Sequence, residues 1–103
     1  MTVLQGAPPH VVVLGGEIDI ATSPAVRRSL MAAISAGHVH LIADMAAVRF
    51  IDARGIGVLV AAANAARMAG GGLSLRAPSR QVRQLLDLLH LEAVLPAARL
   101  AWA

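Results

Sequence analysis

The most informative segment of this chain is Phe50-Ile51-Asp52-Ala53-Arg54-Gly55-Ile56-Gly57-Val58-Leu59. An apolar pair leads into the acid Asp52, Gly55 permits close approach of the backbone, and a smooth apolar helix follows. A loop that ends at an acid and opens a helix makes a small site, because the first N–H groups of a helix have no partner within it. The stretch therefore predicts a strand-to-helix connection that carries a candidate site.

Apolar runs on both sides of this stretch predict strands. The run at 11–14 is rich in β-branched residues and is bounded by Gly15-Gly16, which is typical of a buried strand. Residues 45–51 are expected to form a connection with its own apolar anchors, Val48 and Phe50. The predicted strands are 2–4, 11–14, 40–44, 73–75 and 91–95.

Capping residues and apolar stripes predict the helices. Ser23 is expected to cap the first helix, with Pro24 at its first position, and Gly37 is expected to end it. Ser79 is expected to cap the third. The predicted helices run from Ser23 to Gly37, from about Arg54 to Met68 and from Ser79 to about Leu89, and a short helix is expected at 97–102.

Length and element order indicate the fold class. At 103 residues the chain is expected to be a single domain, 1–103. Strands separated by helices of this length need crossover connections, so the sheet is at least partly parallel. We expect an α/β fold, a small mixed β-sheet with helices packed on it. The core should be aliphatic, because the chain has one Phe, one Trp and no Tyr.

Composition excludes several classes of protein. The net charge of +3 comes from scattered arginines, without a basic run or an aromatic platform for bases, so no nucleic-acid partner is expected. The absence of Cys excludes a disulfide framework. No targeting segment is visible, and the most apolar stretch, 56–66, is shorter than the roughly 20 residues that span a bilayer. We therefore expect a cytoplasmic protein without membrane insertion.

The stretch at 50–59 resembles the core motif of the STAS family of anti-sigma-factor antagonists, which reads apolar-Asp-Ser-Ser/Thr-Gly-apolar-Gly. Gly16-Glu17-Ile18-Asp19 is similar to the family's Gly-Glu-Leu-Asp. The resemblance implies a STAS-type domain with a family-like core at about 11–95. Further segments match in the family's order: Leu41 to Met45, Gly71-Gly72-Leu73 and Val82 to Leu89.

The chain departs from this motif at two positions. In the family, the first Ser after the Asp is the phosphorylated switch; here that position is Ala53, followed by Arg54. Phosphorylation would add about −1.5 to −2 charges beside an acid. Because Ala53 has no hydroxyl, this loop resembles a permanently unphosphorylated state. The alternative is a diverged paralogue that has left the signalling role.

The resemblance implies an interaction protein and not an enzyme. Its partner would be an anti-sigma factor, a serine kinase of the histidine-kinase-like ATPase type. Two alternatives are a STAS subunit of a lipid-transport ABC assembly and a regulatory STAS domain that binds a small ligand. The sequence leaves homodimerisation open. The implied partner-binding residues are Glu17, Asp19, Thr22, Asp52, Ala53, Arg54, Gly55 and Gly57.

Several of these residues allow more than one interpretation. Asp52 is expected to cap the helix and can also face a partner. Asp19 is either a partner-facing acid or a solvated turn acid. Arg54 opposes the helix dipole by about 0.3–1 kcal/mol, so it contacts a partner carboxylate, points to solvent, or pairs with Asp52 or Asp19. Thr22 and Ser23 are the two hydroxyl residues expected near the switch loop. Ser23 is interpreted as a cap, so Thr22 is the remaining candidate for a displaced phosphorylation site.

Catalytic and metal-binding patterns are missing from the sequence. There is no Cys, no Lys, no Gly-x-Ser-x-Gly and no Walker loop. Asp19, Asp44 and Asp52 could converge at one edge of the sheet, but nothing pairs a nucleophile with a base. His38 and His40 lack further ligands for a metal. We therefore expect no catalytic residue, no metal and no cofactor.

Overall fold

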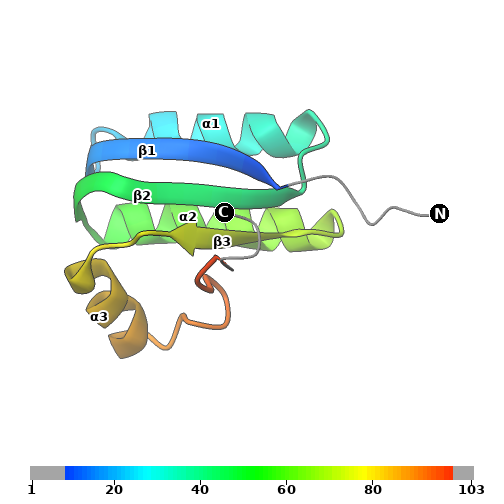
Figure 1. Cartoon of the computed structure of the whole chain (residues 1–103). Coiled ribbons are helices and arrows are strands. Elements are labelled where there is room, and N and C mark those ends of the chain that lie inside the picture. The colour runs from blue at the N-terminus through cyan, green and yellow to red at the C-terminus, as the bar shows by residue number, and fades with distance from the viewer. Residues whose placement is uncertain (1–8, 99–103) are drawn as a thin grey trace.

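The structure is a computed structural model that describes residues 9–98. Within this range, strands and helices alternate along the chain (Figure 1), so the predicted α/β fold is confirmed. The elements in chain order are β1 (His10–Ile18), α1 (Ser23–Ser35), β2 (His40–Ile51), α2 (Ala53–Met68), β3 (Gly72–Arg76) and α3 (Arg80–Leu88).

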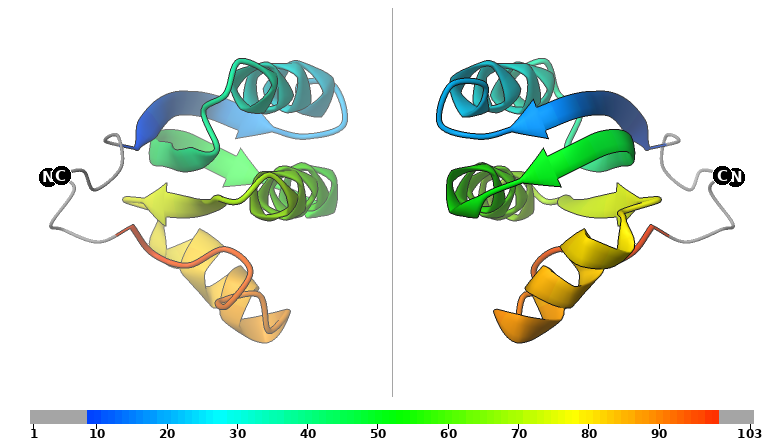
Figure 2. Two further views of the ribbon diagram at one scale, coloured as in Figure 1. Left: turned by 90° about the vertical axis from the view of Figure 1, so that its right-hand side faces the viewer. Right: turned by 90° about the vertical axis from the view of Figure 1, so that its left-hand side faces the viewer.

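The three strands lie in the order β1-β2-β3 and pair in parallel. The crossover helices α1 and α2 pack on one face of this sheet, and α3 lies beyond β3 (Figure 2). Because the strands run parallel, the carboxyl ends of β1 and β2 and the helix starts that follow them meet at one end of the molecule. No helix within residues 9–98 is long and apolar enough to cross a bilayer.

The strands β1 and β2 are longer than the sequence predicts. β1 continues through Gly15-Gly16, and β2 continues through residues 45–51, so the predicted connection there is wrong. The pairing survives two register shifts, between Val13 and Gly15 and between Gly16 and Glu17. These irregularities interrupt the period of two that marks a strand in the sequence.

The core is aliphatic, as predicted. Its largest fully buried side chains come from all three strands and from α1 and α2: Ile18, Leu30, Met45, Leu59 and Leu75. The run at 11–14 is not buried throughout, because β1 lies at the edge of the described sheet and its alternate residues point away from the helices. Val13 is 71% exposed, while Leu14 is buried.

The predicted ends of the helices are mostly correct. α1 ends at Ser35, and Gly37 follows with φ +97, where His38 N–H donates to the Ala33 carbonyl at 2.9 Å. In α3 the Ser79 hydroxyl accepts from Val82 N–H at 3.1 Å, which confirms the predicted cap.

The segment after α3 differs from the prediction. Residues 91–95 form turns and not a strand. Ala97 instead makes a single parallel bridge to Leu75, whose N–H donates to the Pro96 carbonyl at 2.8 Å. Residues 97–98 are not helical, while the expected strand at 2–4 and the rest of the expected terminal helix lie outside the described residues.

Candidate functional site

Two loops meet at the carboxyl end of the sheet, and together they carry the predicted site. The last register pairs of β1 and β2 are Glu17 with Phe50 and Ile18 with Ile51. Beyond them, Asp52 N–H donates to the Ile18 carbonyl at 3.1 Å. The structure therefore joins the two segments that hold the eight residues predicted for partner binding at one end of the sheet. Glu17 lies in the last residues of β1, before the loop that carries Asp19 and Thr22, while Asp52 joins β2 to α2 and Ala53, Arg54, Gly55 and Gly57 lie in the first turns of α2.

Asp19 and Thr22 organise the first loop. Asp19 Oδ1 accepts from the N–H groups of Ala21 at 2.9 Å and Thr22 at 3.1 Å. The Thr22 hydroxyl donates to the Glu17 carbonyl at 2.6 Å and accepts from Asp19 N–H at 2.9 Å. The Thr22 N–H donor, with smaller contributions from its neighbours, lowers the pKa of Asp19. Asp19 therefore acts as a turn acid with an ionised side chain.

The same turn explains why the predicted Ser23 cap is wrong. Thr22 is the N-cap residue of α1, and no side chain caps the helix. Ser23 is the first helical residue, its N–H donates to the Asp19 carbonyl at 2.8 Å, and only 5% of its surface is exposed. Pro24 follows at the start of the helix, as predicted.

Asp52 caps α2, as the sequence predicts. Its Oδ1 accepts from Gly55 N–H at 3.1 Å, in a partly buried position. This bond satisfies one of the unpaired donors at the helix start and places the carboxylate in the favourable field of the helix dipole. Ala53, the position of the missing hydroxyl, is the first residue of α2 and is exposed.

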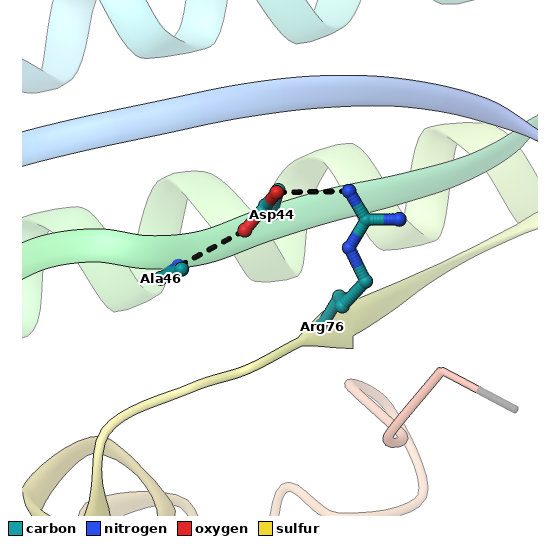
Figure 3. A network of polar contacts seen from close by, with 3 residues as sticks. All are labelled: Asp44, Ala46 and Arg76. Atoms are coloured by element: carbon teal, nitrogen blue, oxygen red, sulfur yellow. Dashed lines mark hydrogen bonds and ion pairs between the residues drawn. The ribbon is translucent and has the colours of Figure 1, made fainter. Parts of the chain in front are cut away.

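Arg54 makes no ion pair within residues 9–98. The ion pair found there joins Arg76 Nη2 to Asp44 Oδ2 at 2.8 Å (Figure 3). Arg54 itself is exposed. The predicted pairing of Arg54 with Asp52 or Asp19 is therefore not formed, and contact with solvent or a partner remains.

Asp44 does not join the other two acids. It lies within β2, opposite Val13 and Arg76, and its Oδ1 accepts from Ala46 N–H at 3.0 Å (Figure 3). The Arg76 side chain, followed by the Ala46 N–H, lowers its pKa. The carboxylate is thus held across β2 and β3, and the expected convergence of Asp19, Asp44 and Asp52 is wrong.

The two glycines of α2 differ in their surroundings. A Cβ on Gly55 would lie 2.5 Å from Ile51 Cγ1 and 2.7 Å from the Ile18 carbonyl oxygen. Only glycine therefore lets α2 start so close to both strands. A Cβ on Gly57 would meet nothing within 4 Å, and Gly57 is exposed. Gly55 thus permits close packing of the helix on the sheet, while Gly57 leaves the exposed helix surface without a side chain at that position.

Two apolar residues at this end of the molecule are exposed, although the sequence did not predict them to lie on the surface. Ile20 is 63% exposed and Phe50 is 52% exposed. Phe50 was predicted to anchor a connection, but it pairs with Glu17 in the sheet on the side away from the buried Ile51. Neighbouring residues of a strand point to opposite faces, so a buried Ile51 would have indicated an exposed Phe50. This inference was possible only if residues 45–51 were assigned to a strand.

The rest of the described structure has few features that suit a ligand. Within residues 9–98, no group of three or more potential ligands could hold a metal ion. His38 stacks on His10 with ring centroids 4.1 Å apart. A cavity of about 220 Å³ lies between α3 and the following segment, near Arg83, Asp87 and Glu92. None of the eight predicted partner-binding residues lines it.

Comparison with known proteins agrees with this geometry. A search of curated proteins finds no match. An anti-sigma factor antagonist from Mycobacterium paratuberculosis is 25% identical, with a TM-score of 0.74 over 97% of this chain and 86% of that one. Phosphorylated SpoIIAA, a Bacillus cell fate determinant, is 20% identical, with a TM-score of 0.70 over 97% and 92%.

The Thermotoga maritima protein TM1081 is 21% identical, with a TM-score of 0.78 over 88% of this chain and 81% of that one. It and SpoIIAA share the fold with this chain. The family model of the STAS domain matches residues 2–100. Since this match spans nearly the whole chain, the protein belongs to the STAS domain family.

Proposed function

We propose that this protein is an anti-sigma-factor antagonist that is not switched by phosphorylation at position 53. It binds an anti-sigma factor, a serine kinase of the histidine-kinase-like ATPase type, and acts by binding alone. The observation that carries the proposal is the exposed start of α2, where Ala53 occupies the family's switch position between Asp52 and Arg54. The likeness to the Mycobacterium paratuberculosis antagonist supports it.

The binding face comprises residues 17–22, residues 50–57 and the exposed side of α2. The hydrogen bond between Asp52 and Ile18 holds its two loops in a fixed relation. Gly57 adds no side chain, so a partner backbone can approach the first turns of α2 closely. A prearranged surface of this kind binds without the entropic cost of ordering a loop.

The missing hydroxyl sets the regulatory state of this face. A phosphate at position 53 would lie beside the Asp52 carboxylate, which already accepts from the helix start. Like charges and the desolvation of a dianion would then oppose docking. With Ala53, this face stays in its unphosphorylated, binding-competent form whatever the activity of the kinase.

The test begins with the partner. Anti-sigma factors of the histidine-kinase-like ATPase class, encoded in the source genome, are purified and titrated with the wild-type chain in a calorimeter. The proposal expects at least one to bind saturably. Failure of every member to bind would contradict the proposal and favour the transport-subunit alternative.

Variants at position 53 then test whether the partner contacts this position when it binds. Ala53→Ser should bind like wild type, while Ala53→Asp and Ala53→Glu should bind about tenfold or more weakly, equivalent to roughly 1.4 kcal/mol. The helix dipole favours the new carboxylate in the free protein, so these variants should fold. Equal affinity of all four proteins would show that partner binding does not depend on the side chain at position 53.

A further inference from the structure

A cavity of about 220 Å³ lies between α3 and the segment that follows it, outside the proposed binding face. Three buried leucines line it, Leu75 from β3, Leu86 from α3 and Leu95 from the following segment, and we call them the leucine floor. Pro78 and Ala97 add further apolar lining. A hollow lined mainly by apolar side chains, with a few charged groups, has the usual composition of a small-molecule site.

Backbone hydrogen bonds fix both walls of this cavity. Figure 2 shows the segment after α3 folding back beside the helix. At this reversal His90 has φ +56, and Leu91 N–H donates to the Leu86 carbonyl at 2.9 Å, which is the geometry of a Schellman turn. Farther along the segment, the Pro96 carbonyl accepts from Leu75 N–H at 2.8 Å. A cavity whose walls are already fixed binds a ligand without first ordering a loop.

The exposed part of the cavity is lined by Arg83, Asp87 and Glu92. The turn brings the two acids together: hydrogen bonding to the Glu92 carboxyl is the main reason why the pKa of Asp87 is raised, while Arg83 acts weakly in the opposite direction. The backbone N–H of Glu92, followed by the Asp87 side chain and more weakly by His90, lowers the pKa of Glu92. Neighbouring carboxylates repel each other when both are ionised, so a cation between them is favourable.

We propose that this cavity is a binding site for a small organic amine, whose ammonium group binds Asp87 and Glu92 while its apolar body rests on the leucine floor. Within residues 9–98, neither carboxylate forms a salt bridge. An anion would be repelled, and an uncharged apolar molecule would desolvate the carboxylates without replacing their water. At roughly 30 Å³ for each water-sized group, the cavity holds a molecule of about seven non-hydrogen atoms. This inference is independent of the proposed function.

Cyclohexylamine is the probe, because it joins one ammonium group to a compact apolar ring of the required size. It is titrated into the isotope-labelled chain and followed by NMR. The amide signals of α3 and of residues 91–98 should shift saturably, with a Kd of about 1 mM or lower. Cyclohexanol has the ring without the charge, and methylamine has the charge without the ring. Each should bind at least about tenfold more weakly.

Acid should weaken the binding of cyclohexylamine. The amine keeps its proton well above neutral pH, as a Lys side chain does. Asp87, whose pKa is raised, takes up a proton as the pH falls, and this proton then competes with the ammonium group. Affinity should therefore decrease between about pH 7 and about pH 4. A constant affinity over this range would contradict binding through the carboxylate pair.

Variants of the charged residues test the assignment directly. Asp87→Asn and Glu92→Gln should each reduce affinity about tenfold, and the double variant should lose saturable binding. Arg83→Gln removes a competing cation and should strengthen binding severalfold. Arg80→Gln is the matched control, because it removes an exposed cation of the same helix that does not line the cavity. It should bind within about twofold of wild type. Thermal unfolding checks that each variant is folded.

Two results would overturn the inference outright: equal affinity for cyclohexylamine and cyclohexanol, or affinity of the double variant within about twofold of wild type. The Lys side chain of a protein is the competing occupant, because it also joins an ammonium group to an apolar chain. Nα-acetyl-lysine methylamide represents it in the same titration. If this compound binds more tightly than cyclohexylamine, the cavity receives a protein side chain and the assignment to a free amine is wrong.

Discussion

Ala53 leaves two hydroxyl residues near the switch loop, and neither is well placed to replace the missing serine. The Thr22 hydroxyl is held between the Glu17 carbonyl and the Asp19 N–H. Ser23 is almost fully buried. A kinase would have to break the turn before α1 to modify either residue. Under the proposed function, neither hydroxyl residue is therefore placed to replace position 53.

The cap on α2 is expected to depend on the shape of the Asp52 side chain more than on its charge. Asp52→Ala removes the acceptor for Gly55 N–H and should cost about 0.5–2 kcal/mol of unfolding free energy. Asp52→Asn keeps an oxygen in place and should cost only a small part of that. Urea denaturation of the three proteins measures both values. An equal loss in the two variants would mean that charge, not the cap, is what matters.

The Asp44–Arg76 pair should make stability depend on pH in the acid range. The pKa of Asp44 lies below its ordinary value of 3.8 because Arg76 and Ala46 favour the ionised form. A carboxyl with a lowered pKa in the folded state contributes stability that is present above the unfolded value and is lost as the pH falls through the folded one.

Asp44→Asn should therefore be less stable than wild type at neutral pH, and the difference should shrink as the pH falls below about 4. Urea denaturation at a series of pH values measures this, with Arg76→Gln as the matched partner variant. A constant difference down to pH 2 would show that the pair contributes through packing instead of charge.

At this scale the sequence predicted some residues and not others. Asp52 follows a strand and precedes a helix, so its role as a cap can be predicted from the neighbouring residues in the sequence. The choice between Thr22 and Ser23 at the start of α1 depends on the turn that the Asp19 side chain builds, and neighbouring hydroxyl residues look alike in the sequence. The exposure of Ile20 depends on the same turn.

At the level of elements, β2 shows why part of the sheet escaped prediction. Met45, Val48 and Ile51 are its buried residues beyond Asp44, and they recur every three residues. The register shifts opposite Val13–Gly15 and Gly16–Glu17 insert extra residues into β2 and displace the alternation. A spacing of three suggests a helix or a loop, and only the pairing partner reveals the strand. The helices, whose periodicity is local, were predicted nearly to their ends.

The junction of α2 with the sheet gives a sharp test of the packing. Gly55→Ala places a methyl group against Ile51 and Ile18 and should cost about 1–3 kcal/mol, as overpacked cores do. Gly57→Ala meets no atom within 4 Å and should stabilise the helix by about 0.5–1 kcal/mol. Denaturant unfolding measures the change in unfolding free energy for both variants. Changes of the same sign would contradict the close packing inferred at Gly55.

On the scale of the whole molecule, the parallel sheet determines where the site lies. Both crossover helices begin where β1 and β2 end, so residues 17–22 and 50–57 are gathered at one end of the molecule (Figure 1). The order of motifs predicted this assembly, because the family resemblance covers most of the chain. It could not predict that Arg54 makes no ion pair within residues 9–98, because the sequence left both loop acids open as its partners.

The proposed function requires that the anti-sigma factor, as a kinase, binds this face without modifying it. The measurement incubates the anti-sigma factor that binds most tightly with Mg-ATP and either wild type, Ala53→Ser or the double variant Ala53→Ser/Arg54→Ser, and records the intact mass of each. We predict no added phosphate on wild type and one phosphate on the double variant, which regains the family's two hydroxyl residues. Stoichiometric phosphate on wild type, or none on the double variant, would contradict the assignment of position 53 as a silent switch.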